Sequence, residues 1–302
     1  MSAPALSPRQ NLARELERPD GEINLARAVL LVAREEYPQL PIEHYLLRLD
    51  LLAAETLDRL GVERMPTVVL EEAKRRLFAI GGLRGNREEP HDPRNCYLND
   101  VLDRRVGTSL TLGIVLLEVG WRLGLPIEGV SVPGHFLVRY RGEAVSFLID
   151  PFHGGAMRRR DEVRRVLGRR PTRPGRQGAT EAWQRSDEGA DTSNVRPECD
   201  FRACTRREMA LRLLLHLKGI YLRAGDGERA LAAVERILLV CPTSRRQIRD
   251  RGRLLASLGR AEEAVAQLEA YLAFAPNAAD AERIEELLRT LRAGRVPGPE
   301  GA

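Results

Sequence analysis

The strongest constraint on the fold is a spacing of 34 residues that recurs in the last third of the chain. Five pairs of similar residues share it: Gly225 and Gly259, Ala230 and Ala264, Val234 and Leu268, Leu238 and Leu272, Pro242 and Pro276. A glycine suits the turn between two helices, a small residue lets helices approach closely, and a proline ends the second helix. The spacing therefore predicts two helix pairs in the same register over residues 211–276, with both alanines buried at helix crossings. A terminal helix over 277–292 would complete the apolar stripe.

This pattern resembles the tetratricopeptide repeat, whose helix–turn–helix unit has the same period. The resemblance implies one of two roles for the repeats. They form a helical cap on the preceding domain, or they form a groove that binds a protein or peptide partner. Because arrays of this kind gain binding surface by adding units, a tandem pair favours the cap. The partner interpretation stays open.

A change of composition separates the repeats from the rest of the chain. Residues 157–200 are rich in arginine, proline and glycine, and their apolar periodicity ends at Leu167. These features predict a linker over 157–204, with disorder over 160–198. The predicted division is a disordered N-terminus (1–20), a first domain (21–156), the linker (157–204) and the repeats (205–293).

The positive charge of the chain bears on nucleic-acid binding. The formal net charge is +5, and Lys74 and Lys218 are the only lysines among 48 basic residues. The most basic stretch, 157–176, has no aromatic side chain on which bases could stack. We therefore expect no nucleic-acid partner. Binding that weakens steeply with salt would indicate the contrary.

Apolar runs and cysteines indicate the compartment. No window approaches the roughly 18 apolar residues of a membrane span, and the first residues lack the apolar core of a signal peptide. The four cysteines are scattered, which suits reduced thiols. Only Cys199 and Cys204 lie close together, and they lack a second ligand pair at zinc spacing, so we expect no metal or other cofactor. The sequence favours a cytoplasmic protein without a membrane partner. It does not indicate the oligomeric state.

The first domain is predicted to be α+β. Helical periodicity covers residues 22–36, 42–60 and 66–77, and a short helix follows Tyr97. An apolar helix then begins after Gly107. Three short runs rich in β-branched and aromatic residues come next and predict an antiparallel meander: 127–132, 136–141 and 144–150. A buried helix that leads into a small antiparallel sheet is an α+β arrangement.

Three polar residues lie at predicted element edges inside apolar segments. Ser109 would begin the buried helix, where backbone N–H groups favour developing negative charge. His135 would open one strand, and Asp150 would close the next. Adjacent antiparallel strands could place the imidazole and the carboxylate side by side, as a nucleophile, a base and an orienting group require. His91 and His153 flank the same segments and are weaker candidates, better interpreted as loop residues.

The order of these residues resembles the transglutaminase-like superfamily, in which a nucleophilic Cys starts a buried helix, a His begins a strand and an Asp ends the following strand. The local sequence also resembles the bacterial SirB-type family, which joins such a domain to tetratricopeptide repeats. The resemblance covers about residues 20–292. Its motifs are NCYLNDVLDRRVG (95–107), LGLPIEGVSVPGHFLVRY (123–140), IDPFHGG (149–155) and LKGIY (217–221).

The chain departs from the superfamily pattern at the nucleophile. Gly107, Thr108 and Ser109 stand where the resemblance implies Gly-x-Cys, and Thr111 is the other alcohol at this helix start. An alcohol has far less anionic character near neutral pH than a thiol. Cys96 lies 13 residues before Ser109 (109 − 96 = 13), outside the motif.

The resemblance and the departure together leave two classes of function open. In the first, the protein is a non-catalytic or weakly active protein-interaction module that kept the fold. In the second, it is a Ser-dependent amide or ester hydrolase or acyl transferase. Ser109 would attack the carbonyl, His135 would move the proton and Asp150 would orient His135. The sequence favours the first class and does not name a substrate or partner.

Overall fold

The computed structural model describes residues 6–163 and 201–294 of the chain. These residues form two compact units. The first contains residues 6–163 and 201–213, and the second begins at residue 214. Within the described ranges, every helix is too short or too polar to cross a lipid bilayer.

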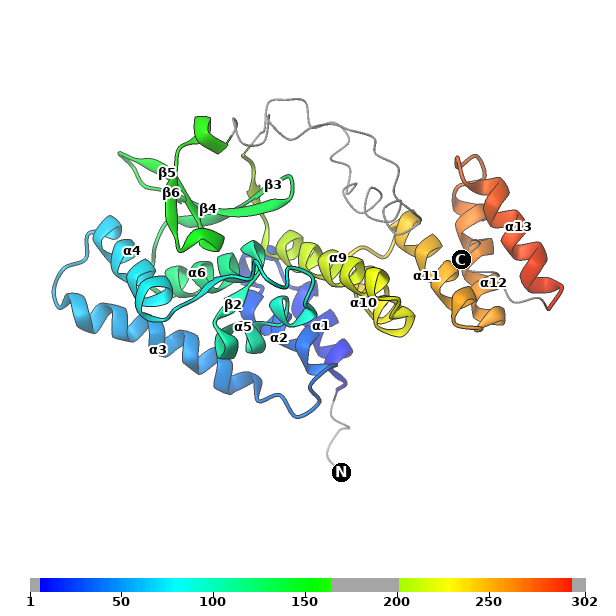
Figure 1. Cartoon of the computed structure of the whole chain (residues 1–302), viewed down its shortest axis with the longest axis horizontal. Coiled ribbons are helices and arrows are strands. Elements are labelled where there is room, and N and C mark those ends of the chain that lie inside the picture. The colour runs from blue at the N-terminus through cyan, green and yellow to red at the C-terminus, as the bar shows by residue number, and fades with distance from the viewer. Residues whose placement is uncertain (1–5, 164–200, 295–302) are drawn as a thin grey trace. The chain divides into compact units, whose positions relative to one another are not determined.

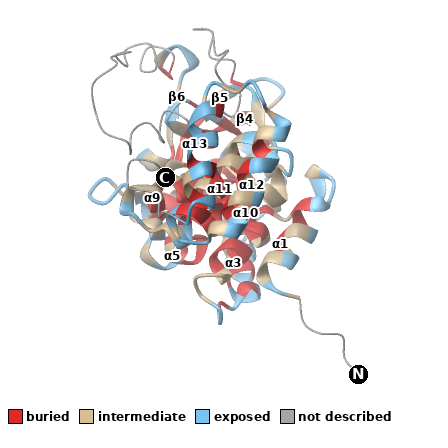
Figure 2. Cartoon of the chain, turned by 90° about the vertical axis from the view of Figure 1, so that its right-hand side faces the viewer, coloured by how far each residue is buried: buried red, intermediate tan, exposed pale blue. Residues whose placement is uncertain are grey.

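Four helices open the first unit: α1 (Pro8–Glu17), α2 (Leu25–Arg34), α3 (Ile42–Leu60) and α4 (Pro66–Lys74) (Figure 1). Helix α2 is buried along most of its length because its side chains are almost all apolar. Helix α3 presents one buried and one exposed face (Figure 2), as its periodicity predicts. Helix α4 continues as a π-helical turn over Arg75–Ile80. The three helices predicted after residue 21 are therefore confirmed.

Helix α1 corrects the expectation that residues 1–20 are disordered. Ser7 and Gln10 form a capping box at its start, in which each side chain accepts a hydrogen bond from the backbone N–H of the other residue. Leu12 and Leu16 are buried, and the helix packs against α2. The helix is short and mostly polar, so its apolar periodicity was too weak to predict it. Residues 1–5 lie outside the described part of the chain.

Two short elements lead to the buried helix α6 (Ser109–Arg122). Helix α5 (Leu98–Arg104) comes first, and β1 (Arg84–Gly85) then pairs in parallel with β2 (Val106–Gly107). Thr108 caps α6, since its hydroxyl oxygen accepts a hydrogen bond from the N–H of Thr111 at 3.1 Å. Every residue from Leu110 to Gly120 is buried. The prediction of a helix buried on most sides is confirmed.

The sheet of the first unit contains five antiparallel strands in the order β6-β5-β4-β3-β7 (Figure 1). Its elements are β3 (Ile127–Val132), β4 (His135–Arg141), β5 (Ser146–Asp150), β6 (Ala156–Arg158) and β7 (Ala203–Cys204). The three central strands form the predicted meander. Val132 pairs with His135 across the β3–β4 turn, and Val138 pairs with Ile149.

The two edge strands lie at the ends of the range predicted as a linker, 157–204. Strand β6 pairs with β5 through Met157 and Arg158, and β7 pairs with β3 through Ala203 and Cys204. These residues are therefore part of the sheet, because backbone groups at the sheet edges find partners there. Residues 164–200, which include most of the predicted disorder over 160–198, lie outside the described part of the chain.

Helix α6 packs closely against the middle of the sheet. Phe136 of β4 is fully buried, and a Cβ atom at Gly113 of α6 would lie only 2.6 Å from its ring. A side chain at residue 113 would therefore separate the helix from β4. This contact holds the start of α6 beside the first residues of β4, where Ser109 and His135 lie.

The second unit is helical and repeats itself with the predicted period. Helix α9 (Arg206–Ala224) begins in the first unit and ends in the second. The other helices are α10 (Gly227–Val240), α11 (Arg245–Ser257), α12 (Ala261–Phe274) and α13 (Ala281–Arg292). The bounds of α10 and α12 differ by 34 residues at both ends (261 − 227 and 274 − 240). Gly225 and Gly259 have φ of 71° and 75°, and Ala230 and Ala264 are fully buried.

A charged pair lies inside this unit. The Lys218 Nζ atom donates to Asp250 Oδ2 at 2.6 Å and to Gln247 Oε1 at 3.1 Å, and all three side chains are buried. Burial opposes ionisation of Asp250, but Lys218 and Arg249 outweigh it and lower the pKa of this carboxyl. The pair links α9 to α11 and, because a misaligned charge would be costly in the core, it specifies their register.

Candidate functional site

The first residues of α6 and β4 and the last residue of β5 bring the three predicted side chains together. His135 opens β4, Asp150 closes β5, and these strands are antiparallel neighbours. Ser109 is the first residue of α6 after the capping Thr108. Asp150 is buried, whereas Ser109 and His135 are half-buried and reach solvent.

His135 and Asp150 form the hydrogen bond that their positions predicted. The Nε2 atom of His135 lies 2.9 Å from Oδ1 of Asp150. A bond to the carboxylate at this nitrogen fixes the tautomer in which Nε2 carries the proton, so Nδ1 is left as the basic nitrogen. The ring edge of Phe152 contacts His135, with ring centroids 6.0 Å apart, and limits rotation of the imidazole.

His153 also belongs to this site, whereas the sequence favoured a loop residue. Its Nδ1 atom lies 2.8 Å from Oδ2 of Asp150, and its backbone N–H donates to Oδ1 at 3.3 Å. Asp150 is the N-cap of a 3₁₀ turn over Pro151–His153, with proline in the first position. An Asp followed by Pro and a residue three positions on is a capping signature, so the pattern could have indicated this backbone contact.

The two imidazoles keep Asp150 ionised. Burial alone would raise the pKa of this carboxyl, but the hydrogen bonds and charges of His135 and His153 outweigh burial and lower the pKa to about 2. Arg158 of β6 adds a guanidinium whose Nε lies 3.7 Å from Oδ2. Asp150 is thus an anion held by three nitrogen-bearing side chains.

The hydroxyl of Ser109 has a different partner from the one expected. Its Oγ atom accepts a hydrogen bond from the backbone N–H of Phe136 at 3.1 Å. No hydrogen bond joins Ser109 to His135 in the described part of the chain. The hydroxyl reaches the residue next to His135 because α6 packs against β4 at this end, where the amide of the second strand residue is available.

Thr111 and Cys96 occupy structural positions. The Thr111 hydroxyl donates to the Asn95 carbonyl oxygen at 2.8 Å and lies 3.0 Å from the Thr108 hydroxyl oxygen, and the side chain is buried. Cys96, next to Asn95, is fully buried. Of the two alcohols considered for the nucleophile position, Ser109 is therefore the one beside β4. His91 is exposed and does not join the cluster that His135, Asp150 and His153 form among the described residues.

Arg212 of α9 holds the turn before His135 and was not predicted. Its Nη2 atom donates to the carbonyl oxygens of Val132 at 3.2 Å and His135 at 2.9 Å. The side chain is largely desolvated, which lowers its pKa. Arg212 and His135 lie 77 residues apart in the chain, so no local pattern could have paired them.

The same three side chains have the composition of a metal site. One ligand atom from each of His135, Asp150 and His153 lies within 4.8 Å of the others. Two imidazoles and a carboxylate suit Zn²⁺ and related ions. However, both imidazoles already bond to Asp150, and Arg158 brings a positive charge to the same carboxylate. Of the cysteine pair considered as a metal site, Cys204 lies in β7 with its thiol pKa raised by burial, and Cys199 lies outside the described residues.

Comparison with known families places the fold and the site in context. The family model described as the transglutaminase-like superfamily matches residues 43–214, and a tetratricopeptide repeat model matches residues 217–289. The first match covers more than half of the chain, so the chain belongs to the transglutaminase-like superfamily. No solved structure matches the chain.

Curated relatives place the chain more closely. A UPF0162 protein of Xylella fastidiosa (strain Temecula1) is 32% identical over 281 residues, which span 92% of this chain and 93% of the relative. A UPF0162 protein of Vibrio cholerae is 26% identical over 89% of this chain and 93% of the relative. Protein SirB1 of Salmonella typhimurium is 26% identical over 201 residues, 65% of each chain. The chain is a member of this SirB-type family of transglutaminase-like proteins with C-terminal repeats.

Proposed function

We propose that this protein is a protein-interaction module whose transglutaminase-like site is non-catalytic or weakly active. The observation that carries the proposal is the state of residue 109. A serine begins α6 where the superfamily pattern implies a thiol, and its Oγ is engaged by the Phe136 N–H rather than by the base. An alcohol without a hydrogen bond to a base has almost no nucleophilic form near neutral pH.

The described cysteines offer no substitute for the thiol. Cys96 is fully buried at the end of a 3₁₀ turn, Cys204 lies in β7 at the far sheet edge, and Cys241 belongs to the second unit. The His135–Asp150 pair then has a structural use. It joins the ends of β4 and β5, while His153 fixes the turn that follows.

The repeats are the surface through which we propose that the protein binds a partner. Repeats of this class commonly bind proteins, and the second unit has the two helix pairs and terminal helix that such a surface needs. The buried stripe through Ala230, Ala264 and the Lys218–Asp250 pair fixes the register of those helices. The cap interpretation remains the alternative role for these repeats, and a protein or peptide is the partner class that we propose.

The second candidate function is a Ser-dependent amide or ester hydrolase or acyl transferase. Two observations favour it: His135 is oriented by an ionised Asp150 with Nδ1 left basic, and Ser109 lies at a helix N-terminus. Rotation of the Ser109 side chain away from Phe136 would bring the hydroxyl toward that base. His135 would then take the proton as Ser109 attacks a carbonyl, and backbone N–H groups near residues 109–111 would stabilise the oxyanion.

Turnover of an activated ester separates the two functions. We expect the wild-type protein to hydrolyse p-nitrophenyl acetate no faster than the Ser109→Ala and His135→Ala variants, each checked for folding by circular dichroism. The matched control is Ser146→Ala, which removes an exposed hydroxyl at the start of β5. A wild-type rate that falls by about a hundredfold or more in Ser109→Ala and His135→Ala but not in Ser146→Ala would establish the enzyme instead.

A further inference from the structure

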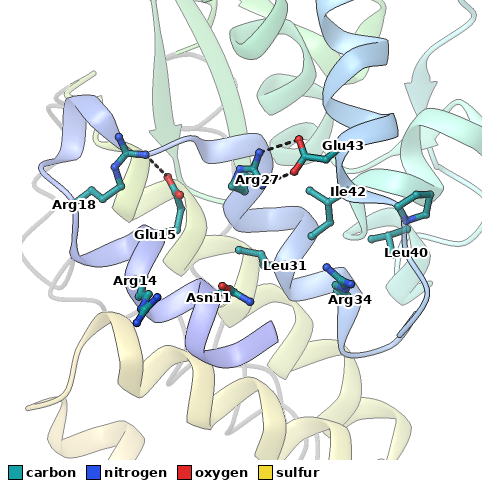
Figure 3. Close-up of a pocket in the computed structure, with 11 residues that line it drawn as sticks. Asn11, Arg14, Glu15, Arg18, Arg27, Leu31, Arg34, Leu40, Ile42 and Glu43 are labelled. Carbon is teal, nitrogen blue, oxygen red and sulfur yellow. Dashed lines mark hydrogen bonds and ion pairs between the residues drawn. The ribbon is translucent and has the colours of Figure 1, made fainter. Parts of the chain in front are cut away.

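A pocket of about 670 Å³ lies among the first three helices, away from the site described above. Its walls come from α1, α2, the segment between α2 and α3, and the start of α3 (Figure 3). This volume is in the range of pockets that bind small molecules. All of its lining residues lie between residues 11 and 43, within the first unit.

Positive charge dominates the rim of this pocket. Four arginines line it (Arg14, Arg18, Arg27 and Arg34), against two glutamates (Glu15 and Glu43), which leaves an excess of two positive charges (4 − 2 = 2). Both glutamates already have partners. Glu43 accepts two hydrogen bonds from Arg27, at 2.7 and 3.0 Å, and Glu15 accepts the Asn24 N–H at 2.6 Å and lies 3.5 Å from Arg18.

Arg14 and Arg34 account for the excess charge. Among the described residues, neither guanidinium makes a hydrogen bond or an ion pair, whereas the glutamates beside them are engaged elsewhere. Figure 3 shows the two side chains on opposite sides of Asn11 and Leu31, from α1 and α2 respectively. Two guanidinium groups at one concavity are suited to a single anionic group, because each can donate two N–H bonds to it.

The pocket also offers apolar surface next to this charge. Leu31, Leu40 and Ile42 line it and are otherwise buried in the helix packing. An inorganic anion would leave this surface in contact with water. A ligand with an anionic head and a short aliphatic body would cover both parts of the wall.

We propose that this pocket binds a small organic anion, with a phosphate or carboxylate head held by Arg14 and Arg34 and a short aliphatic body against Leu31 and Ile42. The two heads share the same recognition chemistry, and the test below distinguishes them. The inference does not rest on the proposed function, because none of Ser109, His135 and Asp150 lines the pocket. Loss of one therefore leaves the other standing.

Isothermal titration calorimetry of the full chain tests the proposal with three probes: inorganic phosphate, hexyl phosphate and hexanoate. We expect saturable binding of at least one hexyl probe with 1:1 stoichiometry, about tenfold or more tighter than inorganic phosphate because its aliphatic body is buried. The affinity should fall as sodium chloride is raised, since the head is held by charge. The tighter of the two hexyl probes identifies the head that the pocket prefers.

Two double variants make the test specific. Arg14→Gln with Arg34→Gln should weaken binding of the hexyl probe by about tenfold or more. The control, Arg87→Gln with Arg141→Gln, removes the same charge from two exposed arginines of the same unit outside the pocket and should leave the affinity unchanged. Absence of saturable binding by both hexyl probes, or equal affinity of the two double variants, would overturn the proposal. Inorganic phosphate binding as tightly as the hexyl probes would overturn the aliphatic body.

Discussion

Asp150 is the residue on which the candidate site depends. Its side chain is only 7% exposed and accepts hydrogen bonds from two imidazoles on different elements. Because burial opposes the charge and the histidines favour it, the net fall of its pKa to about 2 means that the folded state gains from the ionised form. The same residue caps the turn that carries His153.

Replacement of Asp150 by asparagine should destabilise the protein in a pH-dependent way. The unfolded pKa is about 3.9, above the folded value, so the stabilisation is complete above pH ~4 and is lost as the pH falls toward about 2. We expect Asp150→Asn to lower the free energy of unfolding by about 2 kcal/mol at pH 7 and by less at pH 3. Urea unfolding at both pH values measures this. Asp58→Asn, at an exposed position on α3, is the matched control. An equal loss at both pH values would contradict the linkage.

The sequence predicted part of this residue-level geometry. The hydrogen bond between His135 and Asp150 followed from their places at the ends of adjacent strands, because pairing of a short meander fixes which ends meet. The partner of Ser109 could not be predicted in the same way, since it depends on how closely α6 approaches the Phe136 amide. The contribution of Arg212 depends on a contact across 77 residues and has no local pattern.

At the scale of elements, the repeat spacing determined the helices of the second unit. Helices α10 and α12 are equivalent to the residue, and the buried alanines lie at equivalent positions in them. The burial of Ala230 and Ala264 has a direct energetic consequence. A larger side chain at either position must displace a neighbouring helix or leave the core.

The variant Ala264→Arg should therefore destabilise the second unit. A guanidinium at a position with no exposed surface has neither room nor a charge partner, and we expect a loss of at least about 3 kcal/mol. Ala266→Arg, two residues further along α12 and exposed, should change stability by less than about 0.5 kcal/mol. Chemical denaturation followed by circular dichroism compares the two. Equal stability of the variants would mean that Ala264 does not lie in a packed core.

Elements with weak or non-local signals were the ones missed. Helix α1 has few apolar residues, and its strongest local signal was the Ser7–Gln10 capping box. Strands β6 and β7 have three and two residues, and they join β5 and β3 only because the chain brings them to the two sheet edges. A long amphipathic helix such as α3 was predicted with its bounds because its periodicity covers several turns.

At the scale of the molecule, a transglutaminase-like unit and a repeat unit share one chain, and the relatives match this combination over most of their length. The central claim is that the first unit retains an assembled His135–Asp150 pair while residue 109 supplies no reactive nucleophile. The claim separates geometry from reactivity. It requires that a better nucleophile at residue 109 should meet a base that is already oriented.

Acylation of residue 109 is the most direct measurement of that claim. The wild-type protein and Ser109→Cys are incubated with p-nitrophenyl acetate, and peptide mass spectrometry locates the acetyl group. A thiolate at residue 109 would attack the ester carbonyl, with its proton taken by His135 and p-nitrophenolate released. We expect the introduced thiol of the variant to be acetylated, faster than buried Cys96, and no acetyl group on Ser109 in the wild type. Acetylated Ser109 in the wild type, or no acetylation at residue 109 in either protein, would contradict the account.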